Sequence, residues 1–174
     1  LGMTATPERT DDFDIYELFD HNIAYEIRLH DALEENMLVP FHYHGVREIM
    51  VNGTVLDDKS SFNQLTCEAR VQHILHYADL YGSDTDRVKG LVFCNAVDVA
   101  KSLADAFCRH GRRAVALDGS ASEQQRADAV RRLEADAKTS TDYLDYIFTC
   151  DLFNEGIDIP QVNQIIMLRP TQSA

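Results

Sequence analysis

The sequence contains no tryptophan and has only four prolines and four cysteines among its 174 residues. It also lacks any apolar run approaching the roughly 18 residues that a membrane-spanning helix requires, so we expect no membrane partner. None of the cysteines, at positions 67, 94, 108 and 150, belongs to a CxxC pair. This pattern favours reduced, buried thiols and a cytoplasmic protein over a disulfide framework or a zinc site.

Sequence motifs that mark several kinds of catalytic site are missing as well. There is no Gly-Lys dipeptide, and therefore no GxxxxGK[ST] loop to hold a triphosphate. There is no Asp-Glu dipeptide to serve as an acidic Mg²⁺-binding box, no GxSxG and no HExxH. The histidine pairs His42–His44 and His73–His76 have no evident third ligand, so we predict no metal site. We do not expect this chain alone to turn over a substrate.

Basic residues are scarce relative to acidic ones. The chain has 16 lysines and arginines against 29 aspartates and glutamates, a formal net charge of −13. A protein that binds nucleic acid on its own usually has a basic surface, so this balance argues against such a protein. It leaves room for a local basic groove on an acidic body.

Hydrophobic periodicity predicts an α/β protein. Helical spacing recurs from residue 64 onward and alternates with short, wholly apolar strands of the kind that are covered on both faces. The segment 47–63 is polar, and Asn52-Gly53 marks a turn in an excursion or small hairpin. We expect strands at 23–29, 38–46, 90–95, 112–119, 145–153 and 162–170, and helices at 30–37, 64–81, 96–111 and 120–137.

Regular alternation of helix and strand is typical of a three-layer open parallel sheet with helices on both faces. Ligands of such sheets bind at the carboxyl ends of the strands. Those ends carry Cys94-Asn95, the stretch 118–122 and the stretch 151–160, which should open on one edge. In the last stretch Gly156 permits close backbone approach to a ligand, and Asp158 can accept hydrogen bonds from a ribose or an arginine. The alternative is an ordinary loop with surface acids.

Two further features have both a functional and a structural interpretation. The stretch 118–122 precedes a helix and could present free N–H groups to a phosphate, although Ser122 with Gln125 also forms a simple capping box. The arginine pairs 112–113 and 131–132 could face a phosphate backbone, although such pairs are more often part of a solvated helix face.

Four segments, in order, resemble motifs of superfamily-two helicases of the DEAD/DEAH-box-like group that includes type III restriction-subunit ATPases. "TATPER" looks like the third motif, at the end of the first RecA-like lobe, and "GLVFCN" looks like the fourth, in the second lobe. "CDLFNEGIDIP" looks like the fifth, and "IIMLRPTQS" is similar to the strand leading towards the sixth. The resemblance implies a RecA-like, P-loop NTPase-like C-terminal helicase lobe at residues 20–174, incomplete at its C-terminus. Residues 1–19 would end the first lobe and form the linker.

The resemblance also implies roles for individual residues. Thr4 and Thr6 would couple ATP hydrolysis to lobe movement, and no catalytic set would be complete. The ATP cleft would be lined by Asn154, Glu155, Gly156 and Asp158, and the nucleic-acid backbone would be contacted by Asn95, Ser120, Thr149 and Cys150. Many relatives have threonine where Cys150 stands and arginine where Glu155 stands. A thiol is a poor hydrogen-bond donor, and Thr149 could face the core instead.

The parent protein implied is an ATP-dependent helicase or translocase that uses ATP and Mg²⁺, which this fragment alone would not bind tightly. Its partners would be DNA or RNA, with DNA favoured, and the first RecA-like lobe of the same chain. One alternative is a degenerate, non-catalytic lobe that binds nucleic acid or protein. Another is an unrelated doubly wound nucleotide-binding domain, which the missing glycine fingerprint disfavours.

Overall fold

The structure is a computed structural model and describes residues 16–51, 53–57, 59–83, 85–150, 152 and 159–169. It divides into two compact units, residues 1–45 and residues 46–174. The division at residues 19 and 20 that the sequence suggests concerns the two lobes of a helicase, and it stays a prediction.

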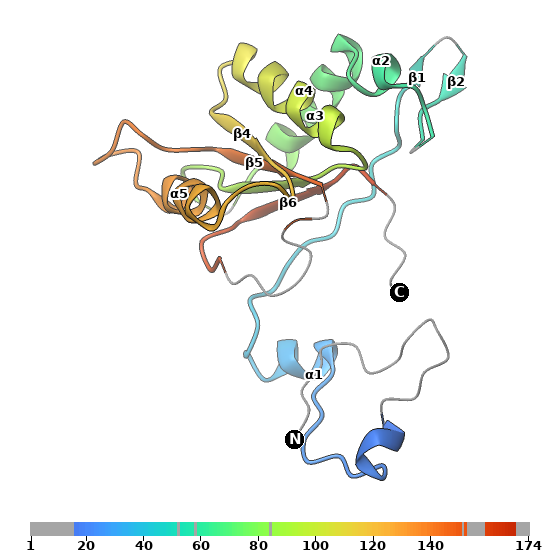
Figure 1. The fold of residues 1–174 in the computed structure, drawn as a ribbon, viewed down its shortest axis with the longest axis vertical. Coiled ribbons are helices and arrows are strands. Elements are labelled where there is room, and N and C mark those ends of the chain that lie inside the picture. Colours follow the sequence, from blue (N-terminus) through green and yellow to red (C-terminus); the bar gives the residue numbers. More distant parts are fainter. Residues whose placement is uncertain are drawn as a thin grey trace. The chain divides into compact units, whose positions relative to one another are not determined.

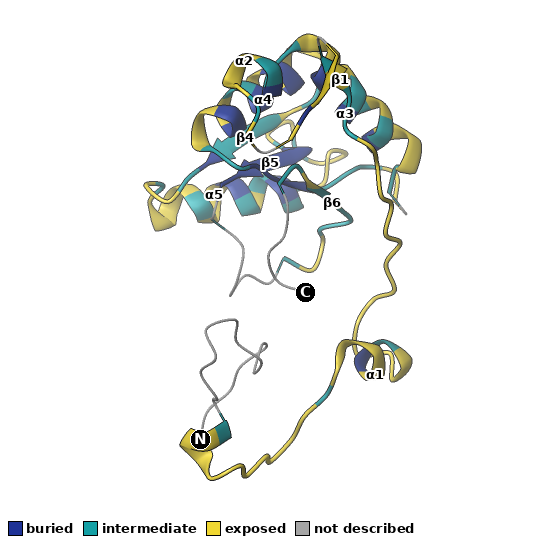
Figure 2. Cartoon of the chain, turned by 90° about the vertical axis from the view of Figure 1, so that its right-hand side faces the viewer, coloured by how far each residue is buried: buried dark blue, intermediate teal, exposed yellow. Residues whose placement is uncertain are grey.

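The described residues of the first unit, 16–45, contain little secondary structure. A 3₁₀ turn, η1, spans Tyr16–Phe19, and the helix α1 spans Leu29–Glu34, which confirms the helix predicted at 30–37. Ala32 is the one buried residue among those described here, and Figure 2 shows α1 exposed over most of its surface.

The strands predicted at 23–29 and 38–46 are wrong. Neither segment forms a strand, although part of each alternates apolar and polar residues. In the first, the backbone of Arg28 donates to Asp31 Oδ2 (3.4 Å) and the chain enters α1 at Leu29. In the second, Pro40 has no N–H to offer a ladder. A strand also needs a partner, which an alternating pattern does not provide.

The second unit opens with a small antiparallel hairpin. Its strands are β1, Met50–Val51, and β2, Thr54–Val55, with Met50 opposite Val55. Gly53 in the turn has a φ of 80°, a conformation that glycine adopts without strain. The turn predicted from Asn52-Gly53 is therefore confirmed as the small hairpin, one of the two forms that the sequence left open.

The helix predicted at 64–81 is two helices. Helix α2 spans Phe62–Leu65 and helix α3 spans Glu68–Tyr81. Ser61 donates to Gln64 Oε1 from its backbone (3.0 Å) and its hydroxyl (2.7 Å), and α2 starts at Phe62, two residues earlier than predicted. The chain then straightens at Cys67 (φ −67°, ψ 150°) before α3 begins.

A four-stranded parallel sheet organises the rest of the chain (Figure 1). Its strands pair in the order β4-β5-β3-β6, with Gly90 of β3 level with Tyr146 of β5 and Gln164 of β6. The α/β fold with a parallel sheet is confirmed. The strands are β3 Gly90–Phe93, β4 Ala114–Leu117, β5 Tyr146–Thr149 and β6 Gln164–Met167, and the connecting helices are α4 Val97–Arg109 and α5 Glu123–Glu134.

Helices cover both faces of this sheet, as the sequence predicts. On one face α3 and α4 pack around Val92 and Phe148, and Phe107 of α4 meets the Phe148 ring edge-on at 4.9 Å. On the other face α5 brings Leu133 against Ile147. Because β3 and β5 are buried on both sides, their near-continuous apolar sequences are explained.

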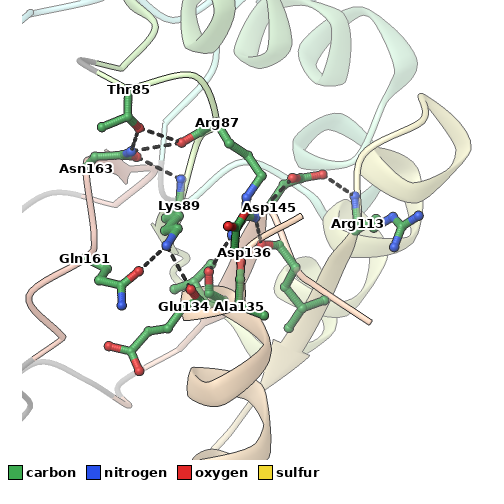
Figure 3. Close-up of polar contacts among 12 residues, drawn as sticks. Thr85, Arg87, Lys89, Arg113, Glu134, Ala135, Asp136, Asp145, Gln161 and Asn163 are labelled. Atoms are coloured by element: carbon green, nitrogen blue, oxygen red, sulfur yellow. Dashed lines mark hydrogen bonds and ion pairs between the residues drawn. The ribbon is translucent and has the colours of Figure 1, made fainter. Parts of the chain in front are cut away.

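The amino ends of the strands are joined by a polar cluster, shown in Figure 3. Asn163, just before β6, accepts from the backbone of Lys89 (2.8 Å) and donates to Thr85 Oγ1 (2.8 Å) and the Arg87 carbonyl (3.0 Å). The Lys89 ammonium donates to Gln161 Oε1. The Asn163 side chain thus holds the start of β6 against the start of β3.

The same cluster closes the C-terminus of α5. The Arg87 guanidinium donates to the carbonyls of Leu133 (2.8 Å) and Ala135 (2.7 Å), and Lys89 Nζ donates to that of Glu134 (2.9 Å). Two cations therefore satisfy carbonyls that the helix leaves without an internal partner, at the end where the helix dipole favours positive charge.

Candidate functional site

The carboxyl ends of β3, β4 and β5 lie at one edge of the sheet because the three strands are parallel and in register. Four of the predicted site residues that the structure describes lie at this edge: Asn95, Ser120, Thr149 and Cys150. The other predicted site residues lie outside the described residues: Thr4, Thr6, Asn154, Glu155, Gly156 and Asp158.

The end of β3 carries Cys94 and Asn95. Cys94 is fully buried, and its backbone donates to the Thr149 carbonyl (2.8 Å), which extends the pairing of β3 with β5 by one residue. Asn95 is half-buried and stands two residues before α4 begins. It therefore lies where the strand gives way to the helix, as the sequence predicts.

Cys94 and Cys150 are neighbours at this edge. Cys94 follows Phe93 and Cys150 follows Thr149, and Phe93 and Thr149 are register partners. Burial raises the pKa of the Cys94 thiol to about 12, and the Cys150 thiol contributes to the rise while the Arg70 and Arg169 guanidiniums oppose it. Both thiols are buried, so the Cys150 thiol, a weak hydrogen-bond donor, lies in the interior of the protein.

Asp118 organises the end of β4. Its Oδ1 accepts from the backbone of Ser120 (2.9 Å) and from the Ser120 hydroxyl, and its Oδ2 pairs with Lys101 Nζ of α4 (2.9 Å). The Ser120 hydrogen bonds, followed by the lysine, hold the pKa of the Asp118 carboxyl well below its usual range. Asp118 is consequently a fixed anion beside the predicted nucleic-acid contact Ser120.

The loop that follows Asp118 is fixed by its own residues. The Ser122 backbone donates to Gln125 Oε1 (2.8 Å) and the Gln125 backbone donates to Ser122 Oγ (3.2 Å), which confirms the capping box. Arg126 donates to the carbonyls of Ala121 (2.9 Å) and Gly119 (3.3 Å). Capping thus engages the backbone N–H groups of Ser122 and Gln125, two of the donors that the phosphate interpretation would require.

Thr149, at the end of β5, faces the interior. It is fully buried, and its hydroxyl donates to the Leu152 carbonyl (2.9 Å), which turns the chain as it leaves the strand. The sequence allowed Thr149 to face either the nucleic acid or the core, and in this conformation its hydroxyl is already engaged in the core.

The arginine pairs are largely engaged with acids. Arg112 pairs with Asp79 (2.5 Å), Arg131 with Asp128 (2.6 Å) and Arg132 with Asp142 (2.7 Å). Arg113 instead lies over the Tyr143 ring, 4.0 Å from its centroid. The solvated-face interpretation therefore fits these arginines better than a phosphate-binding one.

Sequence reasoning missed three participants in this edge: Lys101, Asp118 as the organiser of its loop, and Arg126. The Lys101–Asp118 pair joins a helix to a strand end 17 residues away, a distance that no local pattern predicts. Arg126 lies in the first turn of α5, and its guanidinium reaches back to the loop. Its place four residues after the N-cap Ser122 was the sequence signal that could have identified it.

The described edge is suited to binding more than to bond breaking. It offers an amide, a serine hydroxyl and an ion-paired carboxylate on rigid strand ends. Across the described residues, no group of three or more histidine, cysteine, aspartate or glutamate side chains is arranged to hold a metal ion. In the same residues, no helix is long and apolar enough to cross a membrane.

Comparison with known proteins identifies the class. Residues 69–174 match the family described as the helicase conserved C-terminal domain, and the matched range includes every strand of the parallel sheet. The chain belongs to this family. The resemblance to the C-terminal lobe of a helicase, drawn from four short motifs, is thereby confirmed, and the assignment to superfamily two stays a prediction.

Individual relatives are more distant. A "51.5 kDa protein" of a Lactococcus phage (isolate 7-9) is 24% identical over 176 residues, which cover 99% of this chain and 37% of the phage protein. The chain thus spans little more than a third of that relative. The helicase domain of Pyrococcus furiosus Hef is similar over 63% of this chain and 20% of its own, at 19% identity and a TM-score of 0.42. Domain 2 of the DEAD-box helicase Mss116p, solved bound to an RNA duplex, is similar over 62% of this chain and 39% of its own, at 17% identity and a TM-score of 0.43.

Proposed function

We propose that this chain is the second lobe of an ATP-dependent helicase or translocase, and that its lobe grips a nucleic-acid backbone and completes an ATP cleft. The observation that carries the proposal is the match of residues 69–174 to the helicase C-terminal family. That range contains the sheet whose carboxyl edge holds Asn95 and Ser120. Ligands of open parallel sheets bind at this edge.

The nucleic-acid side of the proposal rests on described residues. Asn95 can donate from its amide. Ser120 can donate its hydroxyl to a phosphate oxygen in place of its hydrogen bond to Asp118, because phosphate oxygens accept and do not donate. Contacts of this kind address the sugar-phosphate backbone and not the bases, so we propose sequence-tolerant binding that weakens with salt. Because the chain carries a net charge of −13, the grip would be local. We propose DNA over RNA as the track.

The nucleotide side remains a proposal from the motif resemblance. Asn154, Glu155, Gly156 and Asp158 would face the ATP cleft, and Thr4 and Thr6 would couple its closure to movement. ATP with Mg²⁺ would supply the free energy, and the first lobe would supply the phosphate loop. The isolated chain would be inactive for this reason.

The test is the ATPase rate of the full-length protein that contains this chain, with and without single-stranded DNA or RNA. We expect nucleic-acid-stimulated turnover that Asp158→Ala abolishes and that the exposed control Asp105→Asn, on α4, retains. Turnover that is insensitive to Asp158→Ala would contradict the assignment of the cleft. Binding of nucleic acid or protein without any turnover would favour the degenerate, non-catalytic lobe.

A further inference from the structure

The β1–β2 hairpin presents an apolar pair to solvent. Met50 and Val55 are directly opposite one another, so their side chains share one face of the hairpin. Met50 is 68% exposed and Val55 is 53% exposed. Leaving two large apolar side chains together in water is unfavourable, and such an arrangement often marks a binding surface.

The base of this hairpin is rigidly anchored. Arg70 is buried, and its guanidinium donates to Glu48 Oε2 through Nε (3.0 Å) and Nη2 (2.7 Å), and to the Leu65 carbonyl through Nη1 (2.9 Å). On the other strand, Leu56 is buried and its backbone donates to the Ile49 carbonyl (3.1 Å). The Glu48–Arg70 salt bridge and the buried Leu56 thus fix both ends of the hairpin, and its apolar face is exposed to solvent.

The anchor lies next to the candidate site. Arg70 is in the first turn of α3, and its neighbours Leu65 and Val71 belong to the same buried cluster as Cys94, at the carboxyl end of β3. Figure 2 shows β1 beside α3. Glu48 binds Arg70, and the neighbours of Arg70 pack in the same cluster as Cys94. The base of the hairpin therefore lies near the sheet edge that holds Asn95.

Two cations flank the hairpin. Arg47 precedes Glu48, and Lys59 follows Asp58; the Arg47 and Lys59 side chains are exposed. Within the described part of the chain, neither side chain forms an ion pair with an acid, whereas the exposed Arg28 and Arg131 pair with Glu26 and Asp128. The hairpin thus combines an apolar face with two cations, which stand close in sequence to the acids Asp57 and Asp58.

We propose that the β1–β2 hairpin is a second nucleic-acid contact, in which Met50 and Val55 pack against an unstacked base and Arg47 and Lys59 neutralise phosphates. The inference rests on the proposed function and deepens it. Apolar side chains such as methionine insert at base steps in other nucleic-acid complexes, and each phosphate contact releases counterions. Because the anchor is rigid, the hairpin would hold the base at a fixed place beside the strand edge.

The experiment measures the affinity of the full-length protein for a fluorescent single-stranded 20-mer by anisotropy. We expect the double variant Met50→Ser/Val55→Ser to bind about tenfold more weakly. Leu80→Ser, which removes an equally exposed apolar side chain from α3, should change the affinity by less than about twofold. In Arg47→Gln/Lys59→Gln, the slope of log K against log salt should fall by about 1.4, or about 0.7 for each lost contact with a single strand.

All substituted residues are exposed, and a thermal melt verifies that each variant is folded. If the parent protein binds the oligonucleotide and both hairpin variants bind equally well, the inference is overturned while the proposed function stands. If Leu80→Ser weakens binding as much as the hairpin variant, the effect is unspecific and the inference is likewise overturned. A hairpin variant that changes only the oligomeric state, measured by light scattering, would assign the surface to a second copy of the chain. A parent protein that binds no nucleic acid would overturn both proposals.

Discussion

Gly90 of β3 lies level with Tyr146 of β5, and the Tyr146 ring occupies the space that a side chain on Gly90 would need. The ring is fully buried, meets Phe107 edge-on at 5.3 Å and donates its hydroxyl to Gln164 Oε1 of β6 (2.9 Å). A single aromatic side chain thereby links three adjacent strands with α4, and glycine is what makes room for it.

Gly90→Ala should lower the free energy of unfolding by about 1–3 kcal/mol, the usual cost of overpacking a core. The new Cβ would overlap the Tyr146 ring, which cannot move without breaking its contacts with Phe107 and Gln164. Urea denaturation is the measurement. The matched control is Gly119→Ala, where nothing lies within 4 Å of the added Cβ; an equal loss in both variants would contradict the packing argument.

Asp118 should make the stability of the protein depend on pH. Its pKa is depressed in the folded state by Ser120 and Lys101, so the folded protein keeps the carboxylate ionised below the pKa of about 3.9 that an unfolded chain has. The stabilisation is present above that pH and is lost as pH falls towards the folded-state pKa. We expect the difference in melting temperature between wild type and Asp118→Asn to be largest above about pH 5 and to shrink below about pH 4.

Asp105→Asn provides the control for that experiment, because Asp105 is an exposed aspartate on α4, away from the loop. Its melting curve should stay parallel to that of wild type over the same pH range. A difference for Asp118→Asn that stays constant from pH 7 to pH 3 would show that the carboxylate contributes through shape and not through charge.

Arg87→Met should destabilise the protein by about 2–3 kcal/mol, because three carbonyls would lose a charged donor at once. These are the carbonyls of Leu133, Ala135 and Leu144, the last at 2.5 Å. Guanidinium denaturation checks the value. Arg109→Met, an exposed substitution in the last turn of α4, should cost less than about 0.5 kcal/mol, and a comparable loss there would remove the special role assigned to Arg87.

Thr149→Val should lower stability by about 1 kcal/mol and leave oligonucleotide affinity within about twofold. The reason is that the hydroxyl of this buried residue donates to Leu152 and does not face the surface. Stability and affinity are measured on the same preparation. A large loss of affinity at unchanged stability would instead establish Thr149 as a direct contact, which is the other interpretation of the sequence.

The elements of the sheet could be predicted because each has a strong local signal. The apolar stretch at 90–93 reads as a buried strand, and the Ser122–Gln125 box marks the start of α5. The failures come from pairing and from breaks. Residues 38–46 have the composition of a strand without a partner, and the extended backbone at Cys67 separates two helices where the sequence predicts one.

The candidate site could be predicted only in part. The edge itself follows from parallel strands, so Asn95 and Ser120 were found from their positions alone. The partners were not found, because Lys101 reaches Asp118 and Arg70 reaches Glu48 across the fold, 17 and 22 positions away. Side-chain contacts at such separations depend on how helices pack, which periodicity does not record.

The different burial of the thiols makes their reactivity a probe of local opening in the native protein. Cys108 is exposed and will react at once with a thiol reagent, whereas Cys94 is fully buried with its pKa raised to about 12. Cys94 can therefore react only when the core packed around it opens. The slow phase of labelling by an alkylating agent, followed by mass spectrometry, would time that opening without any engineered probe, and its change on adding nucleic acid would report how far bound nucleic acid suppresses the opening.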